Sequence, residues 1–222
     1  MAEFDFAGWV ARARAFTLGL DHLPAAEVRS TAVAAPLDEV ALGALEDARG
    51  AVLPTSLRTF FSRGTSAMDC AYTFKPEGQA LDQLRTLLPD ESEIFGGARM
   101  GPASDLADYS TAVREWARDT WIADEPDQRI IWESALPFVA LDNGDYLALD
   151  LQGGATDPSV VYLCHDDESL LLARNLAEFL AAWERLCYLG PEHWLLGPFI
   201  IDSGLDAESE PAKGLRAMLG PR

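Results

Sequence analysis

Residues 136–151 read Leu-Pro-Phe-Val-Ala-Leu-Asp-Asn-Gly-Asp-Tyr-Leu-Ala-Leu-Asp-Leu, which is two apolar runs with a polar break between them. The break contains Asn143-Gly144, and an Asn-Gly pair is a strong hairpin signal because both central turn residues need positive φ. The two runs, Leu136–Leu141 and Tyr146–Leu151, are therefore predicted to be antiparallel strands. Beyond a loop rich in Gly and Pro, Val160–Cys164 predicts a third strand of the same meander.

Helices are predicted on both sides of this meander. Leu37–Ala48 repeats apolar residues at helical spacing, with Pro36 in the first turn and Gly50 just past the end. Asn175 is a predicted N-cap with Glu178 in the capping-box position. Further helices are expected at 4–18, 54–61, 80–88, 105–121, 176–187 and 212–219, short strands at 70–75 and 129–132, and a loop or short strand at 21–35. The fold class is thus α+β, an antiparallel meander sheet flanked by helices.

The composition is that of a globular, soluble protein. The chain has 222 residues, 49% of them apolar, which is enough to bury a core without disulfides. Three widely spaced cysteines, and an N-terminus without a basic and apolar leader, favour a reducing, cytoplasmic location. We expect an N-terminal helical extension packed on the core (1–36), a central domain (37–202) and a polar C-terminal tail (203–222).

Acidic residues dominate the charge. The formal net charge is −19, and the window 123–173 holds eleven acidic residues with Arg129 as its only Lys or Arg. This disfavours nucleic acids and anionic membranes as partners, since both bind through Lys and Arg. It favours a basic protein partner, although acidity that serves only solubility explains the same composition. One or two tryptophans are candidates for anchoring such a partner. The predicted partner-binding residues are Asp142, Asp145, Asp157, Asp166, Asp167 and Glu168.

The order of these motifs resembles the SUKH superfamily, which includes Smi/Knr-type regulators of fungal cell-wall assembly and bacterial immunity proteins. The similar pieces are the "helix, Leu-Pro, helix" at 37–63, the hairpin at 136–151, the strand and turn at 160–167 and the helix start at 175–180. The chain departs from the family pattern at 63–68, which lacks an aromatic residue, and its first 36 residues are additional.

The resemblance implies a SUKH-like domain at 37–202 with a non-enzymatic, protein-binding role. In bacterial members that role is immunity, in which the protein neutralises a polymorphic toxin of nuclease or deaminase type. In fungal members it is a regulatory scaffold with an endogenous partner, which is the alternative here. An acidic face fits an inhibitor of a basic toxin, because such a toxin holds phosphates with Lys and Arg.

Metal and catalytic sites are expected to be absent. The run His165–Glu168 has metal-ligand residue types, but consecutive residues cannot all face one ion and no second His has a fitting spacing. The acids of Asp142–Asp150 depart from an EF-hand, whose twelfth position is Gly153 here, and so predict a braced turn. Cys164 and His165 point to opposite faces of a strand, which disfavours a nucleophile–base pair. A metal-dependent enzyme is the least favoured alternative, and no cofactor is expected.

Overall fold

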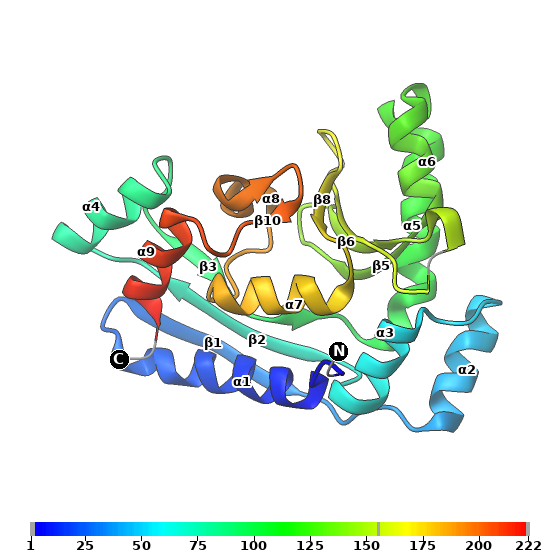
Figure 1. Cartoon of the computed structure of the whole chain (residues 1–222), viewed down its shortest axis with the longest axis horizontal. Helices are drawn as coiled ribbons and strands as arrows, with labels where there is room; N and C mark the ends of the chain where they lie inside the picture. The colour runs from blue at the N-terminus through cyan, green and yellow to red at the C-terminus, as the bar shows by residue number, and fades with distance from the viewer. Residues whose placement is uncertain (1–2, 155, 221–222) are drawn as a thin grey trace.

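The computed structural model describes residues 3–154 and 156–220, which form an α+β fold around two four-stranded antiparallel sheets (Figure 1). The first sheet has the order β1-β2-β3, and β4 pairs with β2 beside β3. The second sheet is a simple meander with the order β5-β6-β7-β8. The strands are β1 (Ala26–Val33), β2 (Met68–Phe74), β3 (Ile94–Gly96), β4 (Arg99–Met100), β5 (Ala135–Ala140), β6 (Tyr146–Asp150), β7 (Val160–Leu163), β8 (Leu170–Ala173) and a separate pair, β9 (Ile200–Ile201) and β10 (Gly204–Leu205).

Helices cover these sheets, and α7 lies in the middle of the molecule (Figure 1). The α-helices are α1 (Phe6–Gly19), α2 (Glu39–Arg49), α3 (Thr55–Thr59), α4 (Gly78–Leu87), α5 (Leu106–Asp119), α6 (Pro126–Ser134), α7 (Leu176–Arg185), α8 (His193–Leu196) and α9 (Glu210–Leu219). α7 packs on α1 through Trp183 and Trp9, with ring centroids 6.3 Å apart. It packs on β5 through Phe179 and Phe138, 6.4 Å apart. α7 therefore joins the two halves of the fold.

The second sheet is buried on both faces. Leu147 and Leu149 of β6 belong to the core shared with α7, whereas Tyr146 and Ala148 belong to the core under α5 and α6. Neighbouring strand residues point to opposite faces, so a strand between two helical layers needs apolar residues at successive positions. The strands predicted at 136–141, 146–151 and 160–164 are confirmed as β5, β6 and β7.

The turn between β5 and β6 differs from the predicted one. In this turn only Gly144 has a positive φ, at 95°. Asn143 does not, because Cys187 and Tyr188 are the only described residues other than glycine with a positive φ. The Gly144 N–H donates to the Leu141 carbonyl (3.1 Å), and the Leu141 N–H donates to the Asp145 carbonyl (2.9 Å). This is the wider hairpin loop in which a glycine bulge follows an ordinary turn. The hairpin was predicted correctly and its turn type was not.

The strand predicted at 129–132 is wrong, because these residues lie in α6. Pro126 occupies the first turn of that helix, where its missing N–H costs no hydrogen bond, and Asp127 adds a favourable negative charge there. Trp132 is fully buried while Ile130 is 45% exposed, which is the one-sided burial of a surface helix. The β-branched pair at 130–131 therefore does not decide the local structure.

Other expectations were met with shifted boundaries. The helices predicted at 4–18, 80–88, 105–121 and 212–219 and the strand predicted at 70–75 are present as α1, α4, α5, α9 and β2. α2 begins at Glu39 with Asp38 as its N-cap, so Pro36 lies outside its first turn, and Gly50 ends it in the left-handed conformation as predicted. Residues 26–33 form the full strand β1, and β8 was not predicted.

Both ends of the described chain pack on the core. Trp9 of α1 is fully buried and its indole N–H donates to the Leu180 carbonyl in α7 (2.9 Å). In α9, which contacts α4, Leu215 and Leu219 are buried. The division of the chain at residues 36 and 202 stays a prediction.

Candidate functional site

Asp145 is the centre of a buried polar cluster behind the hairpin turn. Its side chain has no exposed surface, and its two oxygens accept four hydrogen bonds. The donors are the Asn143 amide, the Tyr162 hydroxyl, and both the backbone N–H (2.8 Å) and the ring Nδ1 (2.7 Å) of His165. The cluster therefore ties the 142–145 turn to the end of β7 and to the turn that follows it.

The hydrogen bonds keep Asp145 ionised in spite of its burial. Desolvation raises the pKa of a buried carboxyl, but the bonds from Tyr162, His165 and Asn143 outweigh it, and the pKa of Asp145 lies below its ordinary value. The same contact shifts Tyr162 the other way. Burial first, and then the bond to the Asp145 carboxylate, raise the pKa of the Tyr162 hydroxyl far above its usual range. Tyr162 is thus a permanent donor to this carboxylate.

Cys164 and His193 complete the cluster from two other elements. The Cys164 Sγ lies 3.1 Å from Asp166 Oδ1 and 3.9 Å from His193 Nδ1, which in turn lies 3.8 Å from Asp145 Oδ2. Ligand atoms of Asp145, Cys164 and His193 all lie within 4.8 Å of one another, as do those of Asp145, His165 and Asp166. These residues have the types that bind zinc.

Hydrogen bonds within the protein account for the contacts of this cluster. Both oxygens of Asp145 are already engaged by two donors each. Burial, and then the contact with Asp166, raise the pKa of the Cys164 thiol to about 12, so the thiol is protonated and donates to Asp166. We interpret the cluster as a brace that holds the two acidic turns.

The predicted acidic residues fall at two ends of the second sheet. β6 pairs with β7 in the register Tyr146 to Leu163, which places the 142–145 and 165–168 turns at the same end of the sheet. At that end the structure exposes the side chains of Asp142, Asp166, Asp167 and Glu168. Asp157 is exposed at the opposite end, in the loop between β6 and β7. Asp145 is fully buried, so its prediction as a surface residue for partner binding was wrong, because its carboxylate is engaged by hydrogen bonds inside the protein.

One exposed tryptophan lies beside these turns. Trp121 is 37% exposed, and its indole N–H donates to the His165 carbonyl (2.6 Å). Trp194 is 43% exposed and packs on Phe95 of β3. Trp132 and Trp183 are fully buried, and Trp116 is partly buried. Trp121 therefore places a partly exposed aromatic ring at the acidic end of the second sheet.

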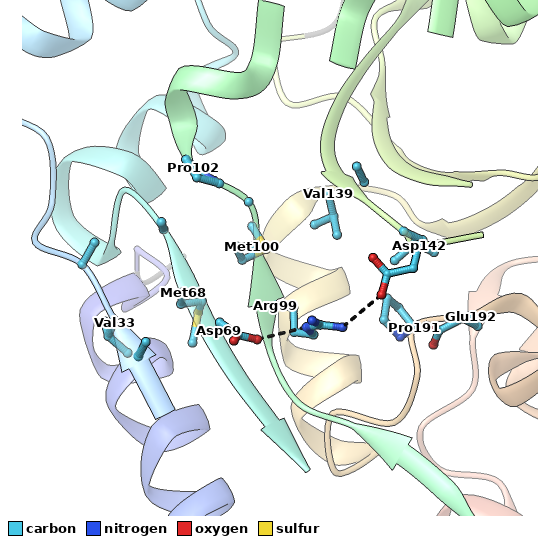
Figure 2. A pocket seen from close by; sticks show the side chains of 16 residues that line it. Val33, Met68, Asp69, Arg99, Met100, Pro102, Val139, Asp142, Pro191 and Glu192 are labelled. Atoms are coloured by element: carbon cyan, nitrogen blue, oxygen red, sulfur yellow. Dashed lines mark hydrogen bonds and ion pairs between the residues drawn. The ribbon is translucent and has the colours of Figure 1, made fainter. Parts of the chain in front are cut away.

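A cleft of about 520 Å³ opens between the two sheets next to the acidic turns (Figure 2). The ends of β1 and β2 form one wall with β4, and β5 with its turn forms the other. The Arg99 guanidinium lies across it, 3.0 Å from Asp69 Oδ1 and 4.0 Å from Asp142 Oδ2 (Figure 2). We call this the inter-sheet cleft. It is also lined by Val33, Met68, Met100, Val139, Pro191 and Glu192.

Sequence reasoning missed the inter-sheet cleft. No site was predicted at Arg99 from the sequence. Asp69, Arg99 and Glu192 are far apart in the chain and lie in ordinary local sequence. The only sequence signal for the cleft is Asp142, which was predicted from the hairpin side. His193 was missed for the same reason, since it reaches the Asp145 cluster from 48 positions away.

The described residues contain no helix with both the length and the apolar character of a membrane span. Comparison with curated proteins finds no similar sequence. The model of one family, described as the SMI1 / KNR4 family (SUKH-1), matches residues 36–182, which is more than half of the chain. That match covers α2 to α7 and both acidic turns, and leaves α1, β1 and the segment around His193 outside it. The chain belongs to the SMI1/KNR4 family, SUKH-1.

Proposed function

We propose that this protein is a non-enzymatic, cytoplasmic protein-binding domain that acts as an immunity protein, neutralising a basic toxin domain of nuclease or deaminase type. One observation carries the proposal. The braced turns at 142–145 and 165–168 bring exposed carboxylates from separate loops to one end of the second sheet, beside Trp121. Family membership supports a binding role in general, and the acidic end supplies a surface for it.

Electrostatics favours a basic partner at this surface. Carboxylates on one face speed the encounter with a positively charged protein and penalise acidic ones. A nuclease or deaminase needs Lys and Arg to hold phosphates, and an acidic inhibitor can occupy that same site. Because the two turns are fixed by Asp145, their charges are held in place before binding, which reduces the entropy lost on association.

The test is co-expression with the effector encoded beside this gene. We expect the wild-type protein to restore growth and to form an isolable complex with that effector. A variant with Asp166→Asn, Asp167→Asn and Glu168→Gln should lose about tenfold or more in affinity, because several surface charges that steer and pair with the partner are removed. The control is Asp157→Asn at the opposite end of the same sheet, which should bind as the wild type does.

Two outcomes would contradict the proposal. One is that the triple variant at 166–168, although soluble and folded, protects as well as the wild type, which would leave the acidic turns without a role. The other is the absence of both protection and a complex with the neighbouring effector. If the protein instead captures a housekeeping protein from its own lysate through the same residues, the regulatory-scaffold alternative replaces immunity.

A further inference from the structure

The inter-sheet cleft lies between two sheets that no ladder joins. Among the described residues, β4 pairs with β2 alone and β5 pairs with β6 alone. These two strands line opposite walls of the cleft, with Met100 on one side and Val139 on the other (Figure 2). β4 and β5 also contact each other, so an occupant of the cleft lies over these two strands and not between them.

The floor of the cleft is apolar. Met68, Met100 and Val139 line it and are each nearly buried, at 3%, 2% and 2% exposure. Val33, which is 37% exposed, continues this apolar surface onto the end of β1. A volume of about 520 Å³ lies within the usual range of ~300–1,000 Å³ for pockets that enclose a small ligand or a few side chains. The cleft therefore accepts apolar side chains as well as polar ones.

The rim of the cleft is negative. Three carboxylates line it, those of Asp69, Asp142 and Glu192, against the single guanidinium of Arg99. Arg99 pairs with Asp69 and approaches Asp142, but the Oε2 atom of Glu192 is buried and has no hydrogen-bond partner among the described residues. Burial raises the pKa of the Glu192 carboxyl, against its own backbone hydrogen bond and the nearby Arg99 charge, which lower it. A second cation at the rim would favour the ionised form of this carboxyl.

Arg99 shows what fits the rim. Its guanidinium already bridges the two walls, from Asp69 in β2 to Asp142 in the hairpin turn (Figure 2). The Arg99 side chain is 51% exposed and that of Asp142 is 97% exposed, so this bridge is weak and easily exchanged. A guanidinium from another chain can therefore pair with Asp142 and reach Glu192 without breaking a buried interaction.

We infer that the inter-sheet cleft binds an extended, basic segment of the partner protein, with apolar side chains over Met68, Met100 and Val139 and an arginine or lysine between Asp142 and Glu192. This inference rests on the proposed protein-binding function and names the part of the partner that the protein recognises. The acidic end of the second sheet draws the partner in, and the cleft holds one extended segment of it.

A labelled peptide tests the inference directly. The probe is a fluorescein-labelled octapeptide that alternates arginine and valine, compared by anisotropy with its analogue that has glutamate for arginine. We expect the arginine peptide alone to bind. The double variant Asp142→Asn, Glu192→Gln should weaken its binding about tenfold. The control double variant Asp90→Asn, Asp157→Asn removes the same charge from exposed positions outside both the cleft and the acidic turns, and should change binding less than about twofold. Equal losses in the two variants, or no binding of the arginine peptide, would overturn the inference.

Methionine signals locate the bound peptide. With ¹³C-methyl methionine, the resonances of Met68 and Met100 should shift on titration with the arginine peptide, while that of Met218 in α9 should not. Shifts that spare Met68 and Met100 would place the peptide elsewhere and refute the inference. The two proposals also fail separately. If Asp142→Asn, Glu192→Gln still binds the neighbouring effector but the 166–168 variant does not, the protein-binding function stands and the cleft has no part in it.

Discussion

Replacing Asp145 with alanine removes a carboxylate that accepts four hydrogen bonds inside the protein. The Asn143 amide and the His165 ring lie partly at the surface and can turn to water. The Tyr162 hydroxyl and the His165 backbone N–H are held in place and lose their acceptor. The variant therefore leaves two donors without partners in the fold, and it empties the space that the carboxylate filled.

The expected loss of stability follows from those two donors. A buried polar group left without a partner costs about 1–3 kcal/mol, so Asp145→Ala should lower the free energy of unfolding by roughly 4 kcal/mol. For a chain of this length, each kcal/mol shifts the melting temperature by about 2–4 °C, which predicts a fall of roughly 8–16 °C. Asp142→Ala is the matched control, since that side chain in the same turn is 97% exposed and should change stability by less than about 0.5 kcal/mol.

Urea unfolding followed by circular dichroism measures both variants, with the midpoint and slope fitted separately. A loss below about 1 kcal/mol for Asp145→Ala, with an unchanged slope, would refute the brace. The pH dependence gives a second check. Because the folded pKa of Asp145 is lowered, its contribution is complete above the unfolded value of about 3.9 and is lost as pH falls through the folded value. The gap between wild type and variant should therefore be constant near neutral pH and narrow below about pH 4.

Four further predictions concern local structure. Asn175→Ala removes the side-chain oxygen that accepts a hydrogen bond from the Glu178 N–H (2.8 Å), and should lower the free energy of unfolding in urea by about 1 kcal/mol. An unchanged free energy of unfolding would mean that α7 needs no cap. Gly97→Ala should prevent folding or cost more than about 3 kcal/mol, since its φ is +119° and a Cβ would lie 1.7 Å from the Cys70 carbonyl oxygen. Gly43→Ala, where a Cβ meets open space in α2, should stabilise by about 0.5–1 kcal/mol, and equal effects at the two glycines would contradict the packing. The Cys164 thiol, with a pKa of about 12, should not react with a disulfide reagent at pH 8 until urea is added, and rapid labelling of the native protein would show that it is not buried.

The features predicted from sequence were those decided locally. The β5–β6 hairpin follows from a turn flanked by apolar runs, and Asn175 caps α7 as expected, its side-chain oxygen accepting from the Glu178 N–H. The capping box is only half formed, because the Glu178 carboxylate pairs with Arg174 instead. The strand predicted at 129–132 was wrong because the prediction gave the β-branched pair at 130–131 more weight than the helix-start signal of Pro126.

The features that could not be predicted depend on contacts between distant segments. The sequence of β1 gives only a weak strand pattern, because β1 is an edge strand with half-exposed residues. Its pairing with β2 joins residues about 40 positions apart. The first sheet was therefore not foreseen as a sheet. The inter-sheet cleft needs β2, β4, the hairpin and Glu192 together, and no local pattern links them. The acidic turns were visible in sequence, but that Asp145 points inward while Asp142 points outward was not.

Because Asp145 is buried and Asp142 is exposed, different residues hold these loops in place and form their surface. The inward carboxylate holds the loops in place through contacts with Asn143, Tyr162 and His165, and none of these depends on which side chains the loops display. Substitutions at Asp142 or Glu168 should therefore change the charge of this surface without endangering the fold. If the protein-binding role proposed above holds, its specificity can vary at such exposed positions while the buried Asp145 stays fixed.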